Sequence, residues 1–94
     1  MDSDGWRCFL NWCSGTQDHA LLTELFECLL TPEEKDSIKT RCLIVRALLD
    51  QTQTQRQISE SLQVSIAKIT RGSNQLKRIS PKLKAYLGQT KQAL

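Results

Sequence analysis

Two short helical patterns, separated by three residues, constrain the fold of this chain more than any other feature. The first covers residues 54–62 and opens with a candidate capping box formed by Thr54 and Gln57. The second covers residues 66–76 and repeats apolar residues at helical spacing. Two such helices joined by residues 63–65 predict a helix-turn-helix, although this turn lacks the glycine that such turns often contain. The expected buried set is Ile58, Leu62, Val64 and Ile69.

An ordinary helical hairpin within a bundle has the same periodicity, and the charge distribution helps to separate the two. Residues 1–53 carry five basic and nine acidic residues, a net charge of −4, whereas residues 54–94 carry eight basic and one acidic residue, a net charge of +7. A basic back half suggests contact with a polyanion, although a solvated basic face has the same composition. The outer face of the second helix is polar, and together these features favour the DNA-binding form. That face offers Ala67, Lys68, Thr70 and Arg71.

Helix starts are also marked elsewhere in the chain. Thr31-Pro32 and Ser80-Pro81 each read as an N-cap followed by proline at the first helical position, so helices are expected to begin near 32 and 81. Glu34 completes a capping box with Thr31. The helix from 32 is apolar around much of its circumference, which indicates burial on more than one side and hence a dimer core. Its apolar stripe is Ile38, Cys42, Val45 and Leu49, with Leu43, Ile44 and Leu48 on a neighbouring face.

The segments before residue 31 are helical in pattern as well. Residues 19–30 form a leucine-rich segment, and no strand alternation appears anywhere. An N-terminal stripe consists of Trp6, Phe9, Leu10 and Cys13. The predicted fold is therefore all-α, with six short helices in a single domain of residues 1–94. The helix-turn-helix is expected at about 55–77, and the dimer core at about 1–53 and 81–92.

Several other classes of protein are disfavoured. The four cysteines form no C-x-x-C pair and fall among apolar residues as small core residues do, and a single histidine leaves no metal-ligand spacing, so neither a metal nor a cofactor is expected. No signal peptide is apparent, and no stretch approaches the ~20 apolar residues of a membrane span, so a cytoplasmic protein is expected. No nucleophile–base pairing or phosphate-binding glycine loop points to an enzyme.

The segment Ser65 to Arg78, "SIAKITRGSNQLKR", reads as one helix but contains Gly72 at its middle. A glycine inside a helix costs about 1 kcal/mol relative to alanine. Its presence indicates either that the backbone approaches something closely there or that the helix is weakly held.

Three pieces of the sequence, "LTPEE", "TRCLIV" and "ITRGSN", resemble the bacterial tryptophan repressor family in order and spacing, without an insertion. The resemblance covers roughly residues 20–87. It implies an intertwined all-helical homodimer that binds free L-tryptophan as a corepressor. The liganded dimer then binds operator DNA of tryptophan biosynthesis or uptake genes and represses them.

The resemblance also implies a corepressor site. Arg71 matches the arginine that meets the ligand carboxylate, which a planar guanidinium suits, and Gly72 matches the glycine that lets the ligand lie against the helix. Arg41 matches the arginine that stacks on the indole from the partner subunit. The other matched groups are the carbonyls of Cys28 and Leu30 for the ammonium group, the Thr31 hydroxyl near the carboxylate, and Val45 as a pocket wall.

Simpler interpretations of these residues stay open. Thr31 is explained by its N-cap role alone, Arg71 by a phosphate contact, and Gly72 by packing against another helix. Gln75 stands where the family usually has a serine close to the ligand ammonium. Its amide oxygen can still accept a hydrogen bond, but the side chain is longer, so affinity or analogue preference can differ.

For DNA, Gln55 and Arg56 match positions at the start of the first reading helix, and arginine to guanine is the commonest specific contact. Lys68 replaces a residue that is usually threonine, and Ser59 stands where lysine is common, so the operator is expected to differ in detail. The other matched positions are Ile66, Ala67 and Thr70 on the recognition helix, with Lys77 and Arg78 as phosphate contacts.

Bound tryptophan is expected to act as a wedge between the reading unit and the dimer core. It would set the two recognition helices about one DNA turn apart, ~34 Å. Two alternatives remain: a helix-turn-helix regulator that ignores amino acids, and a helical adaptor whose basic face docks an acidic protein.

Overall fold

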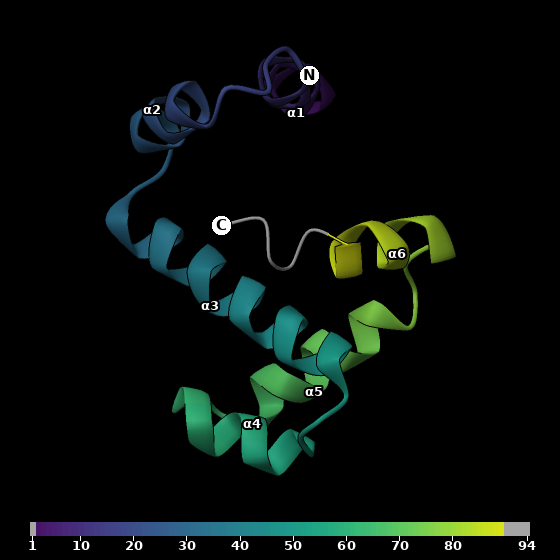
Figure 1. Ribbon diagram of the computed structural model, residues 1–94. Coiled ribbons are helices and arrows are strands. Elements are labelled where there is room, and N and C mark those ends of the chain that lie inside the picture. Colours follow the sequence, from purple (N-terminus) through teal and green to yellow (C-terminus); the bar gives the residue numbers. More distant parts are fainter. Residues whose placement is uncertain (1, 90–94) are drawn as a thin grey trace. The chain divides into compact units, whose positions relative to one another are not determined.

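A computed structural model describes residues 2–89, which form six helices and no strand, as the sequence predicts (Figure 1). The helices are α1 Asp2–Ser14, α2 His19–Leu29, α3 Pro32–Asp50, α4 Gln55–Leu62, α5 Ile66–Leu76 and α6 Pro81–Gln89. None of these six helices combines the length and the apolar composition that a membrane span requires.

The chain forms two compact units, one ending at Lys35 and the other beginning at Asp36. The division into a reading unit and a dimer core stays a prediction, and residues 1 and 90–92 of that dimer core lie outside the described residues.

Hydroxyl caps define the starts of four helices. At α3, the Glu34 backbone N–H donates to the Thr31 hydroxyl (3.1 Å) and the Thr31 N–H donates to the Glu34 carboxylate (2.9 Å), which is the predicted capping box. Thr54 and Gln57 make the same pair of bonds at α4, at 3.1 and 2.8 Å. Ser65 caps α5 and Ser80 caps α6 through single bonds of 3.3 and 3.1 Å.

The N-terminal unit holds α1, α2 and the first turn of α3. Asp18 caps α2 by accepting a hydrogen bond from the Ala20 N–H at 2.9 Å. Aromatic rings join the two helices: Phe9 lies 5.4 Å from Trp6 and 6.2 Å from Phe26 between ring centroids. Tilted rings at these separations contribute beyond the area they bury.

In the C-terminal unit, α3 crosses α5 (Figure 1), and a small apolar core lies between α3 and the helix-turn-helix. Ile44 of α3, Ile58 of α4 and Ile69 of α5 are buried together. Four half-buried residues pack around them: Ala47, Leu48, Leu62 and Val64. The buried set predicted from the sequence is therefore at the centre of the helix-turn-helix, and α3 supplies the surface against which it packs.

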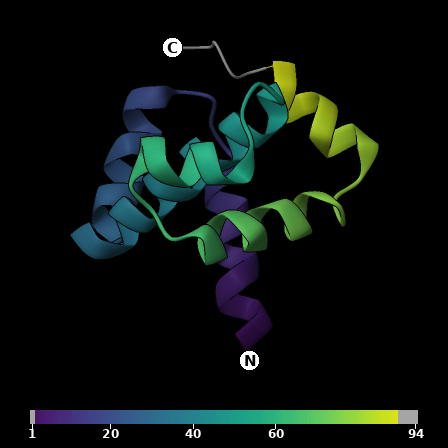
Figure 2. The same ribbon diagram turned by 90° about the horizontal axis from the view of Figure 1, so that it is seen from below.

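The turn between α4 and α5 contains a left-handed residue although it has no glycine. Figure 2 shows α4 and α5 beside one another, joined by this short turn. Gln63 adopts the left-handed conformation, with φ 56° and ψ 46°, that glycine usually supplies. The Ser59 hydroxyl spans the turn and donates to the Val64 carbonyl oxygen at 2.6 Å.

Two expectations about burial are not met within the single chain. The α3 stripe beginning at Ile38 is not the buried one, because Ile44 faces the helix-turn-helix whereas Ile38 is 44% exposed. The cysteines are not core residues of the single chain: Cys8, Cys28 and Cys42 are exposed and Cys13 is half-buried. Within residues 2–89 one small apolar cluster is buried, and Ile38 and the cysteines lie outside it.

Candidate functional site

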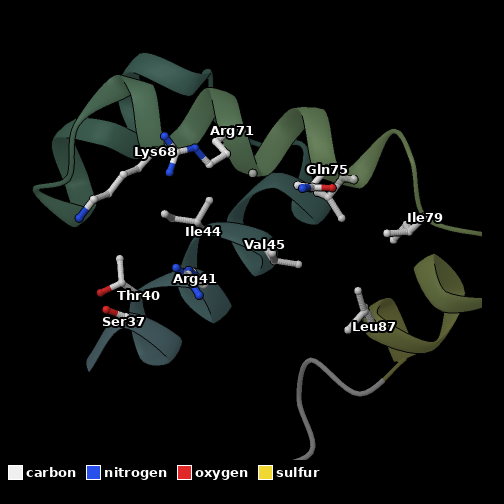
Figure 3. A pocket seen from close by; sticks show the side chains of 12 residues that line it. Ser37, Thr40, Arg41, Ile44, Val45, Lys68, Arg71, Gln75, Ile79 and Leu87 are labelled. Carbon is white, nitrogen blue, oxygen red and sulfur yellow. The ribbon is translucent and has the colours of Figure 1, made fainter. Parts of the chain in front are cut away.

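A pocket of about 580 Å³ lies on the α3 and α5 side of the C-terminal unit, a volume within the range of ligand sites. Figure 3 shows side chains of the two helices facing each other across it. The wall from α3 consists of Ser37, Thr40, Arg41, Ile44 and Val45, and the wall from α5 of Lys68, Arg71, Gly72, Gln75 and Leu76. Ile79, between α5 and α6, and Leu87 of α6 complete the lining.

The charges of this pocket are all positive. Arg41, Lys68 and Arg71 contribute cations, and no Asp or Glu lines the pocket. Among the described residues, none of the three forms an ion pair with a carboxylate of the chain. The neutral polar groups of the pocket are the hydroxyls of Ser37 and Thr40 and the amide of Gln75. The arrangement therefore suits an anionic group carried on a flat apolar body.

Gly72 lets α5 pack closely on α3 at the edge of this pocket. A Cβ atom built at Gly72 would lie 3.0 Å from Ile44 Cγ2 and 3.6 Å from Leu48 Cδ1. The close backbone approach expected from the sequence is thus present, and its partner within the chain is the α3 core. Because Gly72 also lines the pocket, the same residue governs helix packing and the shape of the pocket.

The structure brings five of the eight expected corepressor residues to one pocket: Arg41, Val45, Arg71, Gly72 and Gln75. Arg41 and Arg71 of one chain line this pocket, and the contact of Arg41 with the ligand from the partner subunit stays a prediction. The other three belong to the N-terminal unit. Cys28 lies in the last turn of α2, Leu30 is its C-cap, and Thr31 caps α3.

Several lining residues were not predicted from the sequence. Ser37 and Ile44 lie one helical turn on either side of Arg41, and Lys68 lies one turn before Arg71, so extending each matched arginine by helical spacing would have found them. Ile79 and Leu87 carry no such signal, because they reach the pocket only through the turn that precedes α6.

The expected DNA-facing residues lie mainly on the surface of α4 and α5. Those that are exposed are Arg56, Ile66, Ala67, Lys68, Thr70, Lys77 and Arg78. The first turn of α5 offers Ile66, 49% exposed, together with Ala67 and Lys68. In a helix-turn-helix, this first turn is the part that contacts base edges. No acidic residue follows Glu60, so α5 and α6 carry only positive charge.

Three of the expected DNA-facing residues, Gln55, Ser59 and Thr70, form hydrogen bonds within the helix-turn-helix. The half-buried Gln55 accepts a hydrogen bond from the Thr70 hydroxyl at 3.1 Å, which joins the start of α4 to α5. The half-buried Ser59 bonds to the turn. The amide NH2 group of Gln55 takes no part in this bond, so Gln55 stays a candidate for DNA contact.

Residues that commonly bind metals are scattered over residues 2–89. No group of three or more histidine, cysteine or acidic residues there is placed to hold a metal ion.

A family model and the curated relatives agree on the family that this chain resembles. A family model described as Trp repressor protein matches residues 4–91. A Trp operon repressor homolog of Chlamydia trachomatis serovar D is 44% identical over 87 residues, covering 93% of this chain and 93% of the relative. Homologs with the same name from Chlamydia caviae and Pasteurella multocida are 45% and 38% identical, over 92% and 87% of this chain and 85% and 80% of the relatives.

Proposed function

Since the chain belongs to the tryptophan repressor family, we propose that it binds L-tryptophan as a corepressor and then binds operator DNA of tryptophan biosynthesis or uptake genes. It acts in the cytoplasm without enzymatic activity. The observation that carries the proposal is that α5 serves two surfaces. Its first turn carries the exposed residues Ile66, Ala67 and Lys68, and Arg71, Gly72 and Gln75 line the cationic pocket.

Tryptophan suits the chemistry of this pocket. Arg71 pairs with the carboxylate, and Arg41 offers a guanidinium plane on which the indole stacks. The ammonium group needs acceptors, and Gln75 supplies an amide oxygen in the pocket. Val45 lines the pocket as well. From the family resemblance we expect further ligand contacts from the carbonyls of Cys28 and Leu30, at the C-terminal end of α2 where the helix carries partial negative charge, and from the Thr31 hydroxyl.

The working unit is a homodimer. Within residues 2–89, only three apolar side chains are buried, whereas ten large ones are between 40% and 63% exposed. Such a core is too small to stabilise a chain of this length alone, and burial against a second copy would add the missing apolar area. Among the exposed residues, Ile38 and Leu43 lie on α3, the helix whose apolar circumference led to the dimer prediction.

Ligand controls DNA binding through the position of α5. A molecule between α3 and α5 contacts the helix that reads DNA, and a dimer needs its two reading helices about one DNA turn apart, ~34 Å. A ligand that binds the competent spacing more tightly shifts the population toward it. The coupling is reciprocal, so the matching DNA must tighten tryptophan binding by the same factor.

A selection experiment tests the proposal. Duplexes are enriched from a random library by the wild-type protein with and without L-tryptophan, and the affinity for the enriched duplex is measured in both conditions. The proposal predicts an enriched sequence that is bound more tightly with tryptophan. Enrichment of one sequence regardless of tryptophan would favour a ligand-independent regulator, in which Gln75 has closed the site to the ligand. No enrichment in either condition would favour an adaptor that binds an acidic protein.

A further inference from the structure

One residue, Ser59, makes several hydrogen bonds to the turn between α4 and α5. Its carbonyl oxygen accepts hydrogen bonds from the backbone N–H groups of Gln63 and of Val64, the latter at 3.1 Å. Its hydroxyl donates to the Val64 carbonyl oxygen at 2.6 Å. Three hydrogen bonds thus join a single residue to the turn, and the hydroxyl bond is the one that a side-chain substitution removes.

Gln63 explains why the turn needs fastening. Its φ of 56° lies in the left-handed region, which disfavours any residue that has a Cβ atom. Glycine would adopt this conformation freely, but the sequence has none here. Ser59 bonds to Gln63 and to the residue after it, so it holds the strained conformation in place. The hydroxyl bond is partly buried, where an abandoned carbonyl oxygen is costly.

The same turn sets the direction of α5. Val64 packs its side chain against the core of Ile44, Ile58 and Ile69. The next residue, Ser65, caps α5 by accepting a hydrogen bond from the Lys68 N–H at 3.3 Å. A displacement of the Val64 carbonyl would therefore carry the cap and the first turn of α5 with it, which is the part of a recognition helix that meets base edges.

We propose that Ser59 is a positioning residue for DNA reading. Its hydroxyl holds the turn, and thereby the first turn of α5, rather than contacting DNA itself. The geometry supports this role because the hydroxyl is half-buried and its proton is already donated within the protein. The proposal rests on the proposed function, since it assigns Ser59 to the reading of DNA by this helix-turn-helix.

The test uses the full chain, saturating L-tryptophan, the duplex enriched by the wild-type protein, and a scrambled duplex of the same composition. Fluorescence anisotropy gives both affinities, and circular dichroism reports the folded fraction. Ser59→Ala should weaken binding to the enriched duplex by up to about fivefold, which is the limit if the whole free energy of one neutral hydrogen bond maintains the competent direction of α5. Binding to the scrambled duplex should not change, because phosphate contacts do not depend on the direction of α5. Ser59→Thr, which keeps the hydroxyl, should retain wild-type discrimination.

Three further variants separate positioning from other roles. Ser61→Ala makes the same chemical change at an exposed position of the same helix and should leave both affinities unchanged. Ser59→Lys adds a cation: if position 59 contacted DNA, binding to both duplexes would strengthen and discrimination would be kept, whereas positioning predicts lower discrimination. In the Ser59→Ala background, Gln63→Gly should restore discrimination between the two duplexes, because glycine adopts the left-handed conformation without the help of the Ser59 hydroxyl bond.

The outcomes are distinguishable. If Ser59→Ala weakens both duplexes in proportion to a lower folded fraction, Ser59 is merely structural and the proposal is overturned. If the wild type discriminates and Ser59→Ala discriminates equally well, the role of Ser59 fails while the proposed function stands. If the wild type enriches no duplex at all, the proposed function fails and the role of Ser59 fails with it.

Discussion

Gly72 and Ile44 are in such close contact that a Cβ atom at Gly72 would lie 3.0 Å from the Cγ2 atom of Ile44. Ile44 is only 4% exposed and belongs to the core that holds the helix-turn-helix on α3. Both residues also line the cationic pocket. The contact that fixes the distance between α3 and α5 is therefore part of the wall of this pocket, so a change in the packing of the two helices changes the shape of the proposed ligand site.

Substitution of Gly72 should destabilise the protein in proportion to the volume added. Alanine gains about 1 kcal/mol in helix propensity, but Ile44 is confined by Ile58 and Ile69 and has little room to move, and overpacking costs about 1–3 kcal/mol. Gly72→Ala should thus be near neutral or destabilising by up to ~2 kcal/mol, and Gly72→Val should be clearly worse. Chemical denaturation monitored by circular dichroism measures both.

The control for this prediction is Gly88→Ala in α6, where a Cβ atom meets nothing within 4 Å. It should be neutral or stabilising by up to about 1 kcal/mol. A Gly72→Val variant as stable as the wild type would show that the close contact does not constrain the two helices.

Removal of Lys68 should reveal which part of the ligand the third cation serves. Lys68 lines the pocket beside Arg71 although it is exposed, so its contribution to carboxylate binding is that of a screened surface charge, on the order of 0.5–1 kcal/mol. Lys68→Thr should weaken L-tryptophan binding about threefold and leave the binding of L-tryptophanamide, which lacks the carboxylate, unchanged. Calorimetric titration with each ligand measures this, and an equal loss for the two ligands would contradict a role for Lys68 at the carboxylate.

The two exposed cations that follow α5, Lys77 and Arg78, should contribute to DNA binding without regard to sequence. Replacing both by alanine should weaken binding to the enriched and the scrambled duplex by the same factor. It should also reduce the magnitude of the slope of log affinity against log salt by about 2. Lys39→Ala, which removes a cation paired with Asp36 at 3.6 Å, is the control. A change in sequence preference would mean that these residues contact bases.

The dimer prediction can be tested at Leu43, which is 40% exposed on α3. Leu43→Glu should shift the sedimentation equilibrium from dimer to monomer, because a charge at an apolar interface loses its hydration without a partner. Ile66→Glu is the matched control, since Ile66 is 49% exposed but lies on the DNA-facing helix. It should impair DNA binding and leave the dimer intact. A wild-type chain that sediments as a monomer would contradict the dimer itself.

Local signals in the sequence were sufficient for the helices. Proline after a hydroxyl residue predicted the starts of α3 and α6, and the spacing around Ile58 and Ile69 predicted the helix-turn-helix. These features depend on neighbours within one or two turns, which a single sequence displays directly.

Features that depend on packing between distant segments were not predictable in the same way. That Ile44 rather than Ile38 is the buried residue of α3 follows from the crossing of α3 and α5. The Ser59 bond to the turn depends on the left-handed conformation of Gln63, and a glutamine in the sequence does not indicate that conformation. Ile79 and Leu87 line the pocket because the turn before α6 brings them there, which the sequence does not show.

The most direct test of the proposed corepressor site is a calorimetric titration of L-tryptophan into the wild type, Arg71→Ala and Arg78→Ala. Arg71 lines the pocket, whereas Arg78 is an exposed arginine that follows the same helix and does not line it. We expect saturable binding of one tryptophan per chain in the wild type and in Arg78→Ala, and at least about a tenfold loss in Arg71→Ala, as for a charged hydrogen-bonded pair. Absence of binding to the wild type, or equal binding to Arg71→Ala, would contradict the proposed corepressor site.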